Sequence, residues 1–140
     1  MKNARLLPLM VAILLLSACA PALAQNACDS VDGFAGALRA DGAEVEVAEQ
    51  IEQDFFSVPA QRLVVNGEDI QVLAYASEDA ASQDASQVSA DGYEIGTAMV
   101  TWIATPHFFQ CGNLIVLYVG DNAGMLELLE GQLGAQFAGG

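Results

Sequence analysis

The chain alternates between segments in which apolar residues recur every three or four positions and segments in which they alternate or run together. The first pattern places apolar side chains on one face of an α-helix, and the second is typical of β-strands. Serine, aspartate or asparagine residues suited to helix N-caps stand before each helical segment. We therefore predict helices over residues 30–40, 78–88 and 125–133.

The strand-like segments fall between these helices. Two of them flank Asn66-Gly67, a dipeptide that tolerates two positive φ angles and indicates a hairpin. Residues 114–119 are the most apolar stretch after the N-terminal segment, which predicts a central strand. Residues 105–113, which contain Pro106 and Gly112, are predicted to form a long hairpin connection. The predicted strands span residues 44–47, 62–65, 69–76, 98–104 and 114–119.

The resulting element order is α-β-β-β-α-β-β-α. Hairpins separated by helices favour an α+β class, in which helices are segregated from an antiparallel sheet. We predict a two-layer domain over residues 29–140, with an antiparallel sheet of about five strands and the helices on one face.

The first residues indicate export. Lys2 and Arg5 precede an uncharged apolar stretch at residues 6–16, the arrangement of a secretory signal peptide. That stretch is too short to cross a bilayer, which requires about 20 apolar residues. It is followed by Leu16-Ser17-Ala18-Cys19, which resembles the lipobox of bacterial lipoproteins. This pattern predicts a signal peptide at residues 1–18, a lipidated Cys19 and a short tether at residues 19–28.

A second cleavage site is open at this point. Ala22-Leu23-Ala24 fits ordinary signal peptidase and would release a soluble, secreted protein. The lipobox is favoured because it follows the apolar stretch directly and because the alternative leaves Cys19 unexplained. Acyl chains on Cys19 would anchor the protein outside the cytoplasm, since each buried methylene contributes about 0.8 kcal/mol.

The charge balance is strongly acidic. The formal net charge is −14, and after the signal only Arg39 and Arg62 oppose 18 acidic residues. A nucleic-acid backbone or an anionic lipid surface would repel such a chain, so nucleic-acid binding is not expected. The scattered acids favour a solvated surface, while attraction of cations or of a basic partner is the functional alternative.

Cysteine usage changes the picture of the domain. If Cys19 is lipidated, Cys28 and Cys111 remain as a pair in an oxidising compartment. A bond between them would be worth roughly 4–5 kcal/mol in the chain-entropy description. We predict this disulfide; two free thiols available for metal or catalysis are the alternative.

The C-terminal two-thirds of the chain resembles a family of uncharacterised secreted bacterial proteins, many of them predicted lipoproteins. The resemblance rests mainly on three stretches, with a looser match at residues 72–76 and the alanine-rich helix after them. It implies export and a shared fold, with no activity attached. The three stretches are Trp102-Ile103-Ala104-Thr105-Pro106-His107-Phe108-Phe109, Gly112-Asn113-Leu114-Ile115-Val116-Leu117-Tyr118-Val119-Gly120-Asp121 and Leu133-Gly134-Ala135-Gln136-Phe137-Ala138-Gly139.

Candidate chemistry is sparse. His107, the only histidine, stands four residues before Cys111, so a Cys-His pair, with Cys28 as a further ligand, would suit a thiol- or metal-dependent enzyme. The spacing matches no metal motif. We favour a His107 that shapes its turn through backbone hydrogen bonds. No catalytic residue, metal ligand or cofactor is predicted.

Aromatic residues suggest an interaction surface instead. Phe108 and Phe109, with His107, follow a proline on the predicted connection, where exposed rings would anchor a partner. Burial of these rings in the core is the favoured interpretation of the pattern, and contact with a partner is the functional hypothesis. The sequence thus predicts a non-enzymatic, membrane-anchored binding module with an envelope protein as partner. Cation binding and the thiol- or metal-dependent enzyme are the other hypotheses, and no oligomeric state is predicted.

Overall fold

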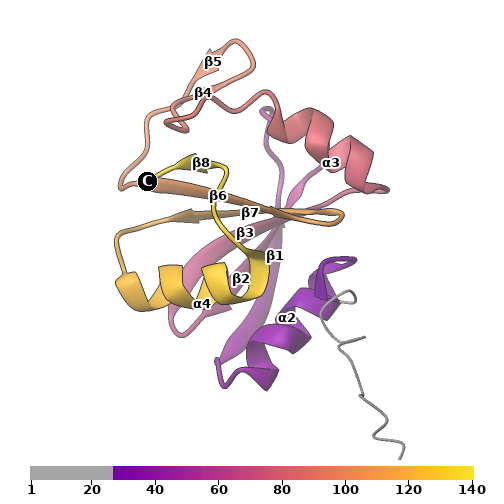
Figure 1. The fold of residues 1–140 in the computed structure, drawn as a ribbon, viewed down its shortest axis with the longest axis vertical. Helices are drawn as coiled ribbons and strands as arrows, with labels where there is room; N and C mark the ends of the chain where they lie inside the picture. Colours follow the sequence, from indigo (N-terminus) through magenta and orange to yellow (C-terminus); the bar gives the residue numbers. More distant parts are fainter. Residues whose placement is uncertain (1–26) are drawn as a thin grey trace, which may run out of the picture.

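The computed structural model describes residues 27–140. A six-stranded sheet runs through the domain in the order β1-β2-β3-β7-β6-β8, and every pairing is antiparallel (Figure 1). A separate small hairpin, β4-β5, projects at one end. The elements are α2 Val31–Ala40, β1 Val45–Ile51, β2 Ala60–Val65, β3 Glu68–Ala74, α3 Glu78–Ala85, β4 Glu94–Ile95, β5 Ala98–Met99, β6 Pro106–Cys111, β7 Leu114–Val119, α4 Ala123–Leu133 and β8 Ala138–Gly139.

The α+β class and the order of the main elements are confirmed. Each helix begins where a short polar side chain accepts a hydrogen bond from a free backbone N–H of its first turn. Ser30 caps α2, Ser77 caps α3 and Asn122 caps α4. The turn between β2 and β3 has positive φ angles at both Asn66 (50°) and Gly67 (84°), as a tight two-residue hairpin requires.

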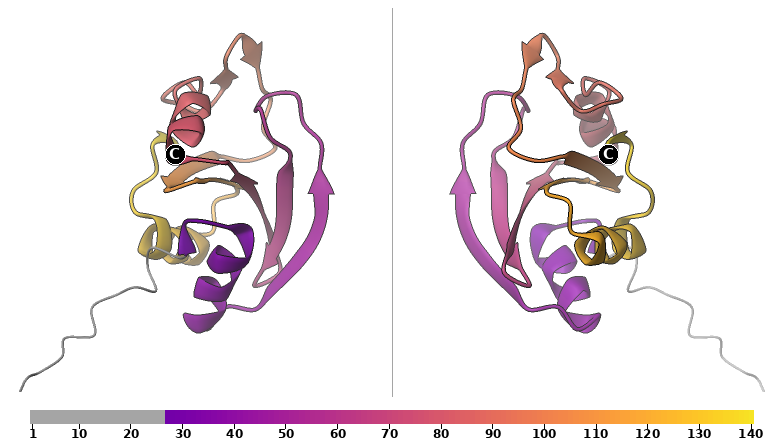
Figure 2. Two further views of the ribbon diagram at one scale, coloured as in Figure 1. Left: turned by 90° about the vertical axis from the view of Figure 1, so that its right-hand side faces the viewer. Right: turned by 90° about the vertical axis from the view of Figure 1, so that its left-hand side faces the viewer.

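The prediction that all helices lie on one face of the sheet is wrong for α3. Helices α2 and α4 pack together on one face of the sheet, and α3 packs on the other (Figures 1 and 2). The reason lies in β7, whose consecutive residues 114–118 are all apolar and buried. Successive strand side chains point to opposite faces, so this strand requires cover on both.

The predicted strand at 98–104 is also wrong. Only Ala98–Met99 is a strand there, and it pairs with β4 rather than with the main sheet. The strand beside β7 is β6, which lies within the predicted connection. Phe108 and Phe109 bury on opposite faces of the sheet, a pattern typical of a strand covered on both sides. Pro106 is tolerated because it is the first residue of that strand.

We call the face under α2 and α4 the closed face. Phe34 and Leu38 of α2 and Leu129 of α4 are fully buried there. They meet Phe109 and Val116, which point to this face from β6 and β7. Alternate residues of the central strands therefore build a continuous core between sheet and helices.

The opposite face is covered only in part, and we call it the half-covered face. Ala81 and Ala85 of α3 pack over Phe108 and Ile115, and Ile95 of the small hairpin joins them. Towards β1 and β2 no helix of residues 27–140 lies over this face (Figure 2). This uneven cover determines where the domain has room for another molecule.

The predicted signal peptide, lipidated Cys19 and most of the tether lie outside the described residues. Among residues 27–140, no helix is both long and apolar enough to cross a membrane.

Candidate functional site

The aromatic pair proposed as a partner contact is buried. Phe108 and Phe109 are each 0% exposed, and His107 is 5% exposed. The hypothesis of a partner contact is wrong and the interpretation as core is confirmed, because residues 106–111 form an interior strand whose side chains enter the cores on both faces. These three residues therefore stabilise the fold and are not accessible to a partner.

His107 connects β6 to the C-terminal segment. Its Nδ1 lies 2.7 Å from Gln136 Oε1 and its Nε2 lies 3.0 Å from the Gly120 carbonyl oxygen. The imidazole also stacks on the Tyr118 ring with centroids 6.0 Å apart. Both ring nitrogens are engaged, so the side chain positions its neighbours, in keeping with a structural histidine.

The Cys-His arrangement is not assembled. On a β-strand, positions four residues apart are separated by about 13 Å, so His107 and Cys111 do not form a catalytic pair. Cys111 is instead bonded to Cys28. Within residues 27–140 there is no group of three or more histidine, cysteine or acidic side chains arranged to hold a metal ion.

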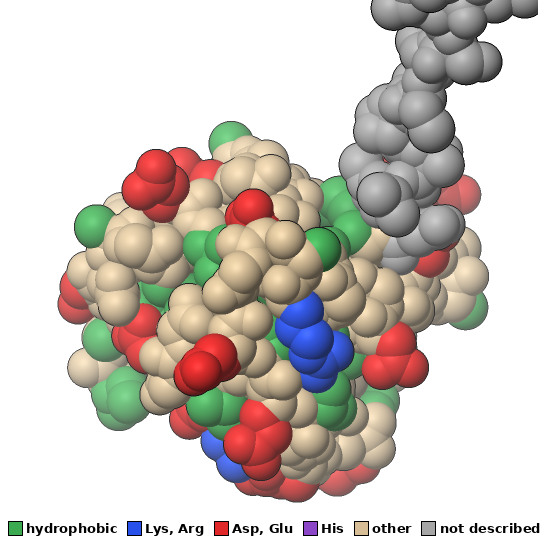
Figure 3. All heavy atoms as spheres, turned by 90° about the horizontal axis from the view of Figure 1, so that it is seen from below, with side chains coloured by type: hydrophobic (Ala, Val, Ile, Leu, Met, Phe, Trp, Pro, Cys, Tyr) green, Lys and Arg blue, Asp and Glu red, His purple; other side chains and the backbone are tan. Residues whose placement is uncertain are grey.

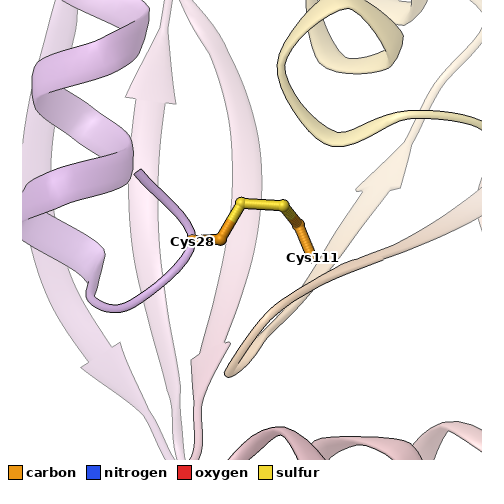
Figure 4. The surroundings of a disulfide bond; sticks show 2 residues. All are labelled: Cys28 and Cys111. Carbon is orange, nitrogen blue, oxygen red and sulfur yellow. A yellow bond between two sulfur atoms is a disulfide. The ribbon is translucent and has the colours of Figure 1, made fainter. Parts of the chain in front are cut away.

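The disulfide between Cys28 and Cys111 is confirmed (Figure 4). It joins the segment before α2 to the end of β6, with Cα atoms 5.2 Å apart and a sequence separation of 83. The Asn113 N–H also donates to the Cys28 carbonyl oxygen at 3.0 Å. Gly112 makes this approach possible, since a Cβ there would lie 2.9 Å from the same oxygen. The bond therefore fixes the start of the domain to the β6-β7 turn.

The half-covered face contains the better candidate site. Strand pairing places Arg62 opposite Gln71, Gln71 opposite Leu117, and Leu117 opposite Phe108. Phe108 is in the core, whereas the Arg62 side chain is 28% exposed. Along this row of cross-strand neighbours, the side chains that cover the sheet end over β3 and β7. A hollow lies between these strands and β1.

Two adjoining hollows form this candidate site, which we call the cleft. The larger has a volume of about 450 Å³ and the smaller about 180 Å³. Ile51, Gln71, Trp102 and Leu117 line both of them. An apolar surface with a few polar groups, in this size range, is typical of a binding site.

One wall of the cleft is the segment between β5 and β6. Trp102 packs edge-on against Phe108, with centroids 6.0 Å apart, and its indole N–H donates to the Gly92 carbonyl oxygen at 2.8 Å. These contacts hold the indole in place. The next residue, Ile103, is 99% exposed. A large apolar side chain held in water beside a fixed aromatic wall is a feature of contact surfaces.

The other wall is the loop after β1, which carries Phe55 and Phe56. Gln53 organises it: its Oε1 accepts from the Phe55 and Phe56 N–H groups, each at 2.7 Å. Its amide nitrogen donates to the carbonyl oxygens of Phe56 and Val58. The loop thus has a defined shape although it belongs to neither helix nor strand.

A buried acid on α3 ties this loop to the domain. Asp84 Oδ2 accepts hydrogen bonds from the Ser57 N–H and hydroxyl, both at 2.7 Å, and from the Tyr75 hydroxyl at 3.0 Å. Gln87 donates to the other oxygen at 3.0 Å. Burial, and then the hydrogen bond to Asp84, raise the pKa of the Tyr75 hydroxyl above its usual range. Each polar group in this small network is therefore satisfied.

Charged side chains of β1, β2 and β3 lie at the open side of the half-covered face. Arg62 donates to both Glu49 oxygens, at 3.0 and 2.7 Å, and to Asp69 Oδ1 at 2.7 Å. The hydrogen bonds from Arg62 hold the pKa of Glu49 below its usual range, and those same carboxylates raise the pKa of Arg62. Glu68 also lines the cleft. One guanidinium thus binds two carboxylates, while the Glu68 carboxylate accepts hydrogen bonds from Tyr118 and Asn122, so the local charge is negative.

The remaining acids are dispersed. Figure 3 shows acidic side chains at many separate places on one face of the molecule, and basic side chains at two. This distribution agrees with a solvated acidic surface. In the cleft, acidic side chains lie beside an apolar floor.

Sequence reasoning missed the cleft. It assigned Trp102 and Ile103 to a strand. Nothing in the sequence Thr101-Trp102-Ile103 indicates that this segment lines a hollow together with residues of β3 and β7.

No protein-family model, curated protein or solved structure matches this chain.

Proposed function

We propose that this chain is an exported, lipid-anchored envelope domain that binds an envelope partner through the cleft and catalyses no reaction. The observation that carries the proposal is the fixed Trp102 wall with the fully exposed Ile103 beside an apolar sheet floor. Anchoring is supported by the lipobox ending at Cys19. Membership in the family of secreted bacterial proteins described above stays a prediction.

The alternatives have less support. A thiol-dependent enzyme requires free Cys28 and Cys111, which are joined in the disulfide. Cation binding by the acidic surface stays a prediction. Calorimetry with calcium tests it, since binding would release or absorb heat and raise the melting temperature.

Anchoring is tested by the intact mass of the mature protein isolated from membranes. A mass that includes acyl chains on Cys19 supports the lipoprotein. Cleavage after Ala24, giving an unmodified chain, would replace it with a secreted protein. Alkylation before and after reduction, in the same samples, checks the state of Cys28 and Cys111.

Binding is tested in the native envelope by replacing Ile103 with a photoreactive amino acid. The full chain, with its signal, is expressed and illuminated, and adducts are compared with those from the same replacement at Met99. Met99 is 81% exposed but does not line the cleft. We expect one discrete adduct from position 103 and none from position 99. Equal labelling from both positions, or none from either, would contradict the proposal.

A further inference from the structure

The cleft combines two kinds of surface that favour the same type of ligand. Its floor is apolar, formed by Ile51 of β1 and by Leu117 and Val119 of β7. Glu68 and Asp69 line the larger hollow together with Arg62, its only basic lining residue, and Arg62 also pairs with Glu49 beside the hollow. A ligand that fills the cleft must therefore offer apolar groups next to positive charge.

The acids are placed to accept such a charge. Glu49 and Asp69 are 63% and 64% exposed at their side chains, so each keeps free lone pairs beyond its bond to Arg62. Glu52 and Asp54 flank the wall residue Gln53 in sequence and are exposed as well. The field of the whole acidic chain adds to this local charge and concentrates cations at the cleft.

The apolar margins indicate an occupant longer than a small molecule. Ile103 borders the larger hollow, and Phe55, which is 40% exposed, borders the smaller one. A ligand confined to either hollow would leave the other margin in water. An extended polypeptide segment, whose side chains project to both sides, would cover the two together.

We infer that the cleft binds a basic segment of a partner polypeptide, with its apolar side chains on the sheet floor and its lysine or arginine side chains on Glu49 and Asp69. This inference rests on the proposed function and names the chemistry of the partner. The negative rim also repels a second copy of this acidic chain, so the occupant is a different protein.

The test uses the purified, disulfide-bonded domain and short synthetic peptides. The probe is a peptide of alternating lysine and valine, and the comparison peptides replace lysine with glutamate or valine with serine. Trp102, the only tryptophan of the chain, lines the cleft and reports binding by its fluorescence. We expect the lysine-valine peptide to bind about tenfold or more tightly than either comparison peptide.

Paired charge variants separate a specific contact from overall charge. The double variant Glu49→Gln with Asp69→Asn removes two charges at the cleft, and Glu127→Gln with Glu130→Gln removes two exposed charges on α4. We expect the first to weaken binding about tenfold or more and the second about twofold or less. Equal effects of the two double variants would overturn the inference.

A second pair of variants tests the apolar margin. Ile103→Ser should weaken binding of the lysine-valine peptide, whereas Met99→Ser should leave it unchanged. If the glutamate-valine peptide binds as tightly and Ile103→Ser still weakens it, the cleft binds peptides without basic specificity. That result would overturn this inference and leave the proposed function in place. If no peptide changes the Trp102 emission while position 103 gives an adduct in cells, the inference also fails and the proposed function stands.

Discussion

The two faces of the sheet have different uses. On the closed face, Phe34, Leu38 and Phe109 are completely buried against α2 and α4. On the half-covered face, the same sheet carries Arg62 and Gln71 at the cleft, and Ile103 beside it is in water. Both faces contribute buried core to the folding free energy, but only the half-covered face also keeps apolar surface available for a partner.

The largest expected effect is a loss of stability when a buried side chain of the closed face is truncated. Phe109→Ala removes a fully buried ring from the closed face and should lower the free energy of unfolding by about 3–5 kcal/mol. Ile103→Ala, a change of similar kind at the cleft, should alter it by about 0.5 kcal/mol or less. Urea denaturation of both variants measures the difference. Similar losses would mean that the cleft wall also supports the fold.

The disulfide gives the next largest effect. Replacing both Cys28 and Cys111 with serine should lower the free energy of unfolding by about 2–4 kcal/mol, since the bond closes a long loop. Denaturation of the wild-type domain with and without a reductant provides the matched measurement. Because the bond lies at the β6-β7 turn, peptide binding at the cleft should persist in the folded double variant. A loss of binding there would connect the bond to the site.

Asp84 is the link between the folded body and the cleft wall. Asp84→Ala leaves the Tyr75 hydroxyl and the Ser57 N–H without their acceptor, which costs about 1–3 kcal/mol. The loop should also open locally, so amide exchange at Phe55 and Phe56 should accelerate more than exchange on α4. Asp79→Ala, at an exposed position of the same helix, is the control. Uniform acceleration over the domain would contradict a local role.

Alkaline pH gives a smaller effect through the same network. The pKa of Tyr75 is raised in the folded state by burial and by Asp84, and burial raises the pKa of Tyr118 as well. A raised folded-state pKa contributes stability that is complete below the unfolded pKa, about 10, and is lost as the pH rises towards the folded value. Stability should therefore decline above about pH 10. Tyr75→Phe should reduce the steepness of that decline, as followed by urea denaturation across the pH range.

Local patterns were sufficient for the helix starts and the tight hairpin, and insufficient for the cleft. The caps at Ser30 and Ser77 and the Asn66-Gly67 turn are determined by neighbouring residues, so sequence reasoning located α2, α3 and the β2-β3 hairpin. The Cys28–Cys111 bond was predicted because export places the chain in an oxidising compartment and because only these two cysteines remain if Cys19 is lipidated. The sequence left both core and partner contact open for Phe108 and Phe109, because an interior strand and an exposed aromatic tip share the same composition. Only the pairing with β7 distinguishes them.

The cleft depends on contacts between residues far apart in the chain. Trp102 is held by Gly92 and Phe108, and the loop at Ser57 is held by Asp84 from a helix 27 residues later. No periodicity encodes such contacts. The acidic character was visible in the composition, and attraction of a basic partner was one of its two interpretations. Only the fold showed that some acids adjoin an apolar floor.

The smallest expected effect on stability is at Arg62. Replacing this residue separates the role of the half-covered face in binding from its role in folding. Its ion pairs with Glu49 and Asp69 are screened by solvent, so Arg62→Met should change the free energy of unfolding very little. The same change frees both carboxylates and should tighten binding of the lysine-valine peptide, because the ligand's ammonium groups no longer compete with the guanidinium. Fluorescence titration and urea denaturation of one variant measure the two effects. Weaker binding by Arg62→Met would mean that the guanidinium itself contacts the ligand, and the half-covered face would then favour an acidic partner.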